Sequence, residues 1–379
     1  RVVERGDVRV VGGRRAVDGA LARRRVELLL GLGRQAVERL VVVLERAARE
    51  HLLADGDQLS LEVSLPAGWT PGEGTTAVLV HGLTGSHQSS YMKRLAGKLV
   101  RRGWRVARVN LRDSGSGEGL ARRPYHGGCS GDIRSVVEAL RPECERLVVA
   151  GFSLGGNIVL KLAGELGPDA AGLVDSVVAL CPAADLRLCV RRIMQPQNRL
   201  YEQQFVKELC ALARRRHARF PDLEPFTLSD EVRILEYDDR YVAQVWGFAD
   251  AYDYYERASA KPHLHRIEVP TQVLLADDDP IIDPAVLDEG GVSDAVTITR
   301  SPRGGHLGFL GRTGPVGDRC GIVHRIRLAL GAEQPEGGQR ALPLAPDLAA
   351  HLRDIAPLPH DLAPQLDLGA GRRDEGHLR

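Results

Sequence analysis

The sequence lacks any long uninterrupted run of apolar residues and is poor in aromatic side chains. Phe, Trp and Tyr make up 4% of its 379 residues. A helix that spans a bilayer needs roughly 18 or more consecutive apolar residues, and no run in the chain approaches that length. We therefore expect no transmembrane segment.

Cysteines are also few and scattered. The chain has six of them, without the paired CxxC spacing of a zinc or redox site and without the density of a disulfide-stabilised secreted domain. This usage favours a reducing compartment, and we expect a cytoplasmic location.

An excess of one charge is missing as well, since 51 basic and 50 acidic residues give a formal net charge of +1. Such a balance creates no overall field that would attract nucleic acid. The sequence has no P-loop, HExxH or EF-hand pattern, and the glycine-rich stretch 110–119 lacks GxGxxG spacing. We expect no cofactor, no metal and no nucleic-acid partner, and the sequence does not indicate an oligomeric state.

The order of patterns along the chain predicts five segments. Residues 1–50 have helical spacing with a basic face, which favours an amphipathic extension packed on the domain over a helix in transient contact with a membrane surface. Short β-rich runs then alternate with helical runs, which predicts an α/β fold with a mostly parallel, doubly wound sheet. The sheet segments are 51–182 and 263–332, separated by a helical lid at 183–262. Residues 333–379 mix Pro, Gly and polar residues and are expected to be a disordered tail.

A nucleophile motif lies between a predicted strand and a predicted helix. Gly151-Phe-Ser-Leu-Gly155 matches GxSxG, with the apolar run RLVVAG before it and the helical run GGNIVLKLAGEL after it. In a nucleophile elbow, a sharp strand-to-helix turn exposes the serine hydroxyl beside the positive end of the helix. The sequence therefore predicts Ser153 as a nucleophile.

A serine hydroxyl needs a base, and the base needs a carboxylate to orient it. The predicted strand PTQVLLA ends at the three aspartates 277–279, and the next strand AVTITR leads to His306. Both groups follow strand ends, and the chain order Ser, Asp, His is that of α/β-hydrolases. We predict the fold of that class, with Ser153 and His306 as nucleophile and base.

The choice among the three aspartates rests on spacing. In this fold the acid usually lies three residues after the small residue that closes its strand, and counting from Ala276 gives Asp279. Asp278 is the alternative, and Asp277 is the weakest candidate. A metal site at this run is disfavoured, because adjacent side chains in extended chain point in opposite directions.

An acyl-transfer site also needs donors for the developing oxyanion. The strand TAVLV runs into the glycine-rich turn 81–85, which can direct a backbone N–H toward the serine. We expect the amides of Leu83 and Leu154 to form the oxyanion hole.

Five stretches together resemble the YheT-like α/β-hydrolases, bacterial relatives of the eukaryotic abhydrolase-domain lipid hydrolases. They are residues 78–112, RRPYHGG at 122–128, GFSLGGNIVLKLAGELG at 151–167, DDDP at 277–280 and GGHLGF at 304–309. The resemblance covers about residues 57–312. It implies hydrolysis of carboxylic esters by Ser153, His306 and Asp279.

The chain departs from this family pattern in three places. It lacks the GHLQT-like stretch before residue 57 and the aromatic-rich helix after residue 312. Asp113 stands where the family usually has glycine, in a turn that can require a positive φ. These differences affect the ends and one loop of the predicted domain.

The predicted lid suggests the class of substrate. It contains 11 of the 17 aromatic residues, and we expect some of them, including Trp246, to cover the site. An apolar cover favours medium-to-long or lipid-like acyl esters. We expect a small-molecule ester as the binding partner. Two alternative functions remain: acyl transfer by the same three residues, and a non-catalytic protein that only binds its ligand.

Overall fold

The structure is a computed structural model that describes residues 46–288 and 291–309. Its centre is one eight-stranded sheet with the strand order β1-β2-β4-β3-β5-β6-β7-β8. Pairing is parallel from β4 through β8 and antiparallel for β1 with β2 and for β2 with β4. The strands are β1 (Arg46–Leu52), β2 (Gln58–Ser64), β3 (Thr75–Val80), β4 (Arg105–Asn110), β5 (Arg146–Phe152), β6 (Ser176–Leu180), β7 (Thr271–Ala276) and β8 (Val296–Ser301).

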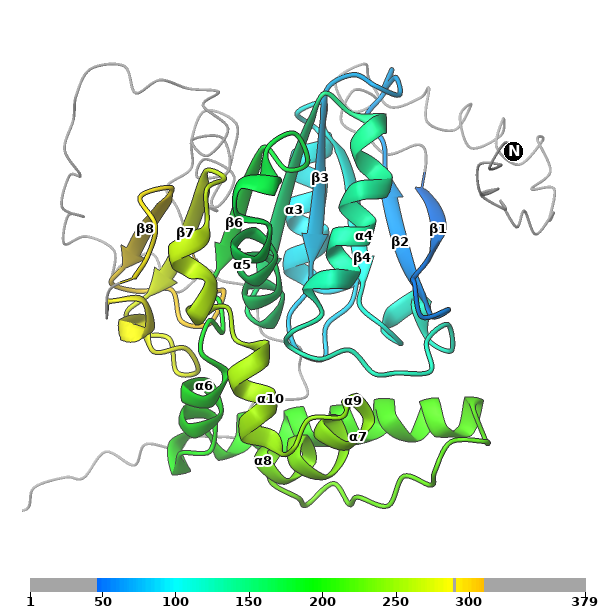
Figure 1. Cartoon of the computed structure of the whole chain (residues 1–379), viewed down its shortest axis with the longest axis vertical. Coiled ribbons are helices and arrows are strands. Elements are labelled where there is room, and N and C mark those ends of the chain that lie inside the picture. Colours follow the sequence, from blue (N-terminus) through cyan, green and yellow to red (C-terminus); the bar gives the residue numbers. More distant parts are fainter. Residues whose placement is uncertain (1–45, 289–290, 310–379) are drawn as a thin grey trace, which may run out of the picture. The chain divides into compact units, whose positions relative to one another are not determined.

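Three helices connect the parallel strands and cover both faces of the sheet. They are α3 (Ser90–Val100), α4 (Ser130–Leu140) and α5 (Leu154–Leu166). In Figure 1, α4 and α5 lie on one face and α3 lies behind the sheet. Because successive right-handed crossovers run first toward one edge of the sheet and then toward the other, they place these helices on opposite faces.

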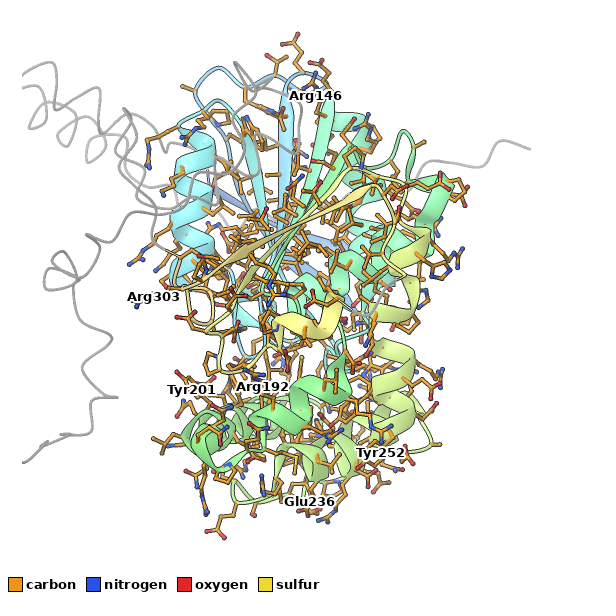
Figure 2. All side chains as sticks on the ribbon, turned by 90° about the vertical axis from the view of Figure 1, so that its left-hand side faces the viewer. Arg146, Arg192, Tyr201, Glu236, Tyr252 and Arg303 are labelled. Carbon is orange, nitrogen blue, oxygen red and sulfur yellow. The ribbon has the colours of Figure 1, made fainter. Side chains whose placement is uncertain are left out.

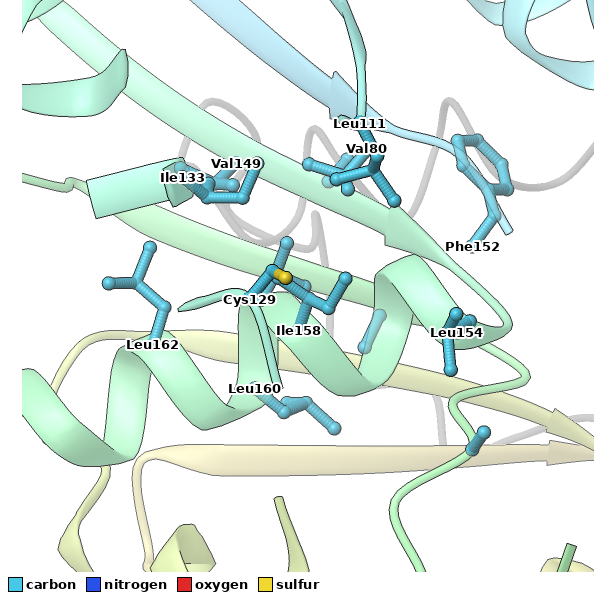
Figure 3. Close-up of a cluster of buried hydrophobic side chains, with 14 of the residues drawn as sticks. Val80, Leu111, Cys129, Ile133, Val149, Phe152, Leu154, Ile158, Leu160 and Leu162 are labelled. Atoms are coloured by element: carbon cyan, nitrogen blue, oxygen red, sulfur yellow. The ribbon is translucent and has the colours of Figure 1, made fainter. Parts of the chain in front are cut away.

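The core is densest around α5, where every residue except Glu165 is buried. Figure 3 shows Ile158 and Leu162 of this helix in one apolar cluster with Val149 of β5 and Ile133 of α4. A helix that is apolar on all sides is enclosed by other elements. Helix α5, which begins directly after Ser153, is therefore enclosed by the elements packed around it.

A helical layer lies between β6 and β7 in the chain. Its helices are α6 (Leu186–Ile193), α7 (Arg199–Arg219), α8 (Ile234–Tyr237), α9 (Gln244–Trp246) and α10 (Ala251–Ala258), with a π-helical turn at Asp238–Ala243 between α8 and α9. They lie beyond one end of the sheet (Figure 1), and the labelled Tyr201, Glu236 and Tyr252 project from the outer surface of the layer in Figure 2. No described residue from 183 to 262 is in a strand, as the sequence predicted.

The predicted strands TAVLV, RLVVAG, PTQVLLA and AVTITR are present as β3, β5, β7 and β8. The prediction of a helix up to residue 50 is wrong for residues 46–50. Residues 46–52 form β1, which pairs antiparallel with β2 from Arg46↔Ser64 to Leu52↔Gln58. Residues 48–50 are exposed, so this edge strand forms through its pairing with β2 and not through an apolar pattern. The rest of the predicted N-terminal helix and the predicted tail at 333–379 lie outside the described residues.

Among the described helices, none combines the length and the apolar character that crossing a bilayer requires.

Candidate active site

Ser153 occupies a strained turn between β5 and α5. Its backbone has φ 52° and ψ −115°, a conformation that a residue with a side chain seldom adopts. A Cβ atom on Gly151 would lie 2.1 Å from the Gly155 oxygen, and one on Gly155 would lie 2.4 Å from the Val80 oxygen. The glycines of the motif are therefore required by close backbone contacts, and the turn presents the serine at the carboxyl end of β5.

A continuous hydrogen-bonded chain links Ser153, His306 and Asp279. Oγ of Ser153 lies 2.9 Å from Nε2 of His306, and Nδ1 of His306 lies 2.9 Å from Oδ2 of Asp279. The second oxygen, Oδ1 of Asp279, accepts the amide hydrogens of Ile281 at 2.8 Å and Ile282 at 2.9 Å. Segments 126 or more residues from the serine are thus brought together in the arrangement that the sequence predicted.

The environment of Asp279 favours its charged form. Burial by itself would raise the pKa of this carboxyl, but hydrogen bonds from His306 and the two amides more than offset burial and leave the pKa below its ordinary value. Asp279 is 1% exposed and therefore accepts from His306 with little competition from water. An ionised carboxylate at Nδ1 fixes the ring orientation and leaves Nε2 facing the serine hydroxyl.

The neighbouring aspartates have other partners. Oδ1 of Asp278 accepts the Gly305 amide hydrogen at 2.7 Å, next to His306. Asp277 is exposed and pairs with Arg300 at 2.9 Å. The position of Asp278 suggests that it positions the His306 loop, a relationship that the sequence did not reveal because it depends on a backbone contact.

The first predicted oxyanion donor, the Leu83 amide, is oriented by the buried His81. Nε2 of His81 accepts the Leu111 amide hydrogen at 3.1 Å, so Nδ1 carries the proton and donates to the Gly82 oxygen at 2.7 Å. Burial lowers the pKa of His81 to about 4, which keeps the ring neutral at pH 7. The C=O and N–H of a trans peptide point in opposite directions. Because His81 fixes the Gly82 oxygen, the Leu83 N–H of the same peptide unit points away from His81.

Two tyrosine hydroxyls accept the amide hydrogens of the residues on either side of Leu83. The Gly82 amide donates to the Tyr91 hydroxyl at 3.0 Å, and the Thr84 amide donates to the Tyr125 hydroxyl at 2.8 Å. Within the described part of the chain, the amides of Leu83 and Leu154 have no hydrogen-bond acceptor. Leu83 and Leu154 line the same pocket as Ser153, as their predicted role in an oxyanion hole requires.

That pocket lies between the sheet and the helical layer and has a cavity volume of about 90 Å³. Its lining is mostly apolar. Side chains from α6, α7 and the loop after β7 contribute to it, including Val190, Ile193, Phe205, Leu209 and Ile281. A largely apolar lining with a few polar groups is typical of small-molecule sites.

The helical layer is joined to the loop that carries Asp279. Arg192 of α6 donates to the backbone carbonyl oxygens of Asp279 at 3.1 Å and Pro280 at 3.2 Å. It also forms an ion pair with the carboxylate of Asp283 at 3.0 Å. Figure 2 places Arg192 where the helical layer meets the sheet. These contacts couple the placement of α6 to that of the acid.

The expectation that Trp246 covers the site is wrong. Tyr254 and Tyr255 line the pocket, but Trp246 does not. Its indole N–H donates to the Pro124 oxygen at 3.0 Å, and its ring packs against His126 with centroids 4.5 Å apart. Trp246 therefore joins the helical layer to the loop at residues 124–126, and the sequence could not show this because the partners are 120 residues apart.

Four charged side chains are buried in the pocket wall, and of these the sequence singled out only Asp113. They are Arg112, Asp113, Arg216 and Asp238. Asp113 has φ 58°, so the turn does require the left-handed conformation that glycine would adopt more easily. Arg112 lies in a loop, and Arg216 and Asp238 are single charged residues in helical segments; such residues are too common to identify a site from sequence.

One group of potential metal ligands coincides with this site. Donor atoms of Cys181, Asp279 and His306 lie within 4.8 Å of one another. Burial raises the pKa of the Cys181 thiol and so disfavours the thiolate that binds metals. The Nδ1 of His306 is already engaged by Asp279, and we assign no metal to this group.

Comparison with known proteins places the chain in a family. A family model described as the alpha/beta hydrolase family matches residues 77–316, which is more than half of the chain. The chain belongs to the alpha/beta hydrolase family. A solved member, the alpha/beta hydrolase GrgF from Penicillium sp. sh18, aligns with a TM-score of 0.51 at 18% identity over 76% of this chain and 99% of that chain, which supports the shared fold.

Two curated relatives show which members of the alpha/beta hydrolase family this chain resembles in sequence. The YheT protein of Escherichia coli (strain K12), a candidate esterase by its name, is 33% identical over 242 residues, which cover 62% of this chain and 71% of the relative. The human monoacylglycerol lipase ABHD2 is 26% identical over 258 residues, which cover 63% of this chain and 60% of the relative. The resemblance to YheT-like hydrolases is confirmed.

The contact between the elbow and β3 provides a test of packing. We expect Gly155→Ala to destabilise the protein by about 1–3 kcal/mol, the usual cost of overpacking, because the new methyl group would meet the oxygens of Val80 and His81. Gly131→Ala is the matched control, since nothing lies within 4 Å of the added methyl group. Urea unfolding of both variants measures the difference, and equal stability would contradict the predicted contact.

Proposed function

We propose that this protein hydrolyses carboxylic esters through an acyl-enzyme formed on Ser153. The observation that carries the proposal is the 2.9 Å separation between Oγ of Ser153 and Nε2 of His306, with Asp279 on the opposite ring nitrogen. Membership of a family that includes proteins named as esterases and lipases supports it.

In the first half-reaction, Oγ of Ser153 attacks the ester carbonyl carbon while its proton moves to Nε2 of His306. The carbonyl electron pair moves onto oxygen, and the amides of Leu83 and Leu154 donate to this oxyanion. When the tetrahedral intermediate collapses, the C–O bond to the alcohol breaks, and His306 returns the proton to the departing oxygen. Asp279 stabilises the imidazolium that exists between these steps.

In the second half-reaction, water replaces the alcohol. His306 accepts a proton from water as the water oxygen attacks the acyl carbon, and the same two amides stabilise the second oxyanion. Collapse releases the carboxylic acid and returns the proton to Oγ of Ser153. The cycle consumes one water and leaves the protein unchanged.

The pocket lining supports medium-to-long or lipid-like acyl groups as substrates. Apolar side chains from α6 and α7 line the pocket that contains Ser153, and an acyl chain longer than acetyl would contact more of them. Removing one methylene from water contributes up to about 0.8 kcal/mol. We also propose that residues 183–262 act as a lid that excludes water from the acyl-enzyme, with the sheet segments before and after it forming the catalytic core.

Labelling with a fluorophosphonate tests the nucleophile directly. This reagent forms a covalent bond with an activated serine, so we expect peptide mapping to place the adduct on Ser153. An adduct on another serine, or none on folded protein, would refute the proposal.

Chain-length preference provides a test of the pocket. We expect p-nitrophenyl octanoate to have a higher kcat/KM than the acetate ester. Phe205→Ala should lower kcat/KM for octanoate more than for acetate, because Phe205 lines the pocket. Trp246→Ala is the matched control, and its effect should not depend on chain length. If acetate is the better substrate and Phe205→Ala affects both esters equally, the lipid-like assignment fails.

A further inference from the structure

Arg216 of α7 is an unusual feature of the pocket wall. It is 2% exposed and lines the same pocket as Ser153. Nη2 of Arg216 donates to the Tyr241 hydroxyl and lies 3.3 Å from Nε2 of His217. Within the described residues, its Nε and Nη1 atoms have no hydrogen-bond partner. A buried guanidinium thus retains donors that the protein does not use.

The adjacent arginines show that ion pairing is available on this helix. Arg214 pairs with Asp230 at 2.7 Å, and Arg215 pairs with Glu118 at 2.9 Å. Arg216 has no carboxylate within ion-pair distance in residues 46–288 and 291–309. Burying an arginine without an ion-pair partner is costly, because the charge loses its hydration. For Arg216 the loss is offset in part by the Tyr241 ring, whose centroid lies 5.1 Å from the guanidinium carbon, and by a longer-range attraction to Asp113.

The other charges of the pocket do not supply the missing partner. Arg112 is neutralised by Asp55, Asp57 and Asp132, each at 2.7 Å. Asp113 feels the positive charge of Arg216, which lowers its pKa, but burial outweighs this and raises the pKa to about 6. Its Oδ1 accepts the Gly119 amide hydrogen at 2.7 Å, and Asp113 forms no ion pair with Arg216 within the described residues.

Asp238 is also committed elsewhere. Its Oδ2 accepts a hydrogen bond from the Tyr255 hydroxyl at 2.7 Å, and burial raises the pKa of Asp238 to about 7. Both acids of the wall are therefore protonated more readily than surface aspartates, whereas the charge of Arg216 is permanent.

The sheet order separates the two ends of the pocket chemically. Arg112 and Asp113 follow β4, on one side of Ser153, while Ile281 and Ile282 follow β7 on the other. A substrate that fills the pocket can therefore place an apolar part at one end and a charged part at the other.

We propose that Arg216 binds a carboxylate or phosphate group carried by the ester substrate, in the pocket that also holds Ser153. The proposal rests on the proposed ester hydrolysis. A planar guanidinium donates two parallel hydrogen bonds to either oxyanion, and such charge-assisted bonds are among the strongest that proteins form. The bound anion would supply the countercharge that the protein lacks.

Two matched ester pairs test this and distinguish the sources of the anion. Mono-p-nitrophenyl suberate differs from p-nitrophenyl octanoate by a terminal carboxylate, and 1-octanoyl-glycerol-3-phosphate differs from 1-octanoyl-glycerol by a phosphate. We expect the charged member of at least one pair to have the higher kcat/KM. Arg216→Met should lower the charged-to-neutral ratio of that pair by about 10- to 100-fold.

Three variants control for charge and folding. Arg215→Met removes a neighbouring exposed charge and should leave the ratio unchanged. Asp113→Asn keeps the acceptor for the Gly119 amide and should raise the ratio, because it removes a negative charge from the wall. Arg216→Lys keeps the positive charge without the two-donor fork and should give an intermediate ratio, which keeps the test readable if Arg216→Met does not fold.

Binding to Ser153→Ala separates failure of this proposal from failure of the proposed function. Suberate should raise the Tm of this variant more than octanoate does, and adding Arg216→Met should remove the difference. If suberate stabilises the variant but no ester is cleaved by the wild type, the hydrolase assignment fails and the anion site stands. If neither ester pair favours its charged member, or the preference survives in Arg216→Met, the anion site is refuted. A second cavity also contacts Arg216. If suberate stabilises Ser153→Ala while the wild type cleaves both members of each ester pair equally well, the anion binds in that second cavity and the proposal is overturned.

Discussion

Ser153→Ala should lower kcat for p-nitrophenyl octanoate by about 10⁴-fold or more, the scale of loss when a triad nucleophile is removed. The reason is that, among the described residues, Ser153 is the only one whose hydroxyl contacts Nε2 of His306, at a distance of 2.9 Å from Oγ. Octanoate should still bind to the variant, because the alanine leaves the apolar lining in place.

The control is Ser229→Ala, which changes an exposed serine of the helical layer. Steady-state kinetics and thermal unfolding of both variants separate a chemical loss from a folding defect. A loss below about tenfold in folded Ser153→Ala would mean that another nucleophile performs the reaction.

Asp279→Asn should lower kcat by roughly 10⁴-fold, because an amide cannot hold the imidazole in the same tautomer or stabilise the imidazolium. Asp278→Asn should cost less than about tenfold, since the amide oxygen of asparagine can still accept the Gly305 hydrogen. Asp277→Asn, which changes only an exposed ion pair with Arg300, is the surface control.

The same variants should differ in acid stability. The pKa of Asp279 is lower in the folded state than its ordinary value, so its ionisation stabilises the protein above that value, and the contribution is lost as pH falls through the folded-state pKa. The gap in stability between wild type and Asp279→Asn should therefore narrow below about pH 4. If Asp278→Asn were the more damaging change in the kinetic assay, the assignment of the acid would be wrong.

The sequence was sufficient where a local pattern had a local physical cause. Ser153 was identifiable because a buried strand, two glycines and a buried helix meet there, and close backbone contacts at Gly151 and Gly155 require that composition. Asp279 followed from its distance to the end of a recognisable strand. The edge strand β1 was missed because Ala, Arg and Glu favour helix locally, and only pairing with β2 makes residues 46–52 extended.

The sequence by itself determined the class of fold, and it predicted Ser153, His306 and Asp279 as nucleophile, base and acid. The tertiary structure decided which lid side chains reach the pocket, placing Phe205 and Tyr254 there and Trp246 against residues 124–126. It also decided that Arg214 and Arg215 find carboxylates while Arg216 is buried without one. Strand and turn signals depend on neighbours in the chain, whereas burial and charge pairing depend on segments that folding brings together from a hundred residues away.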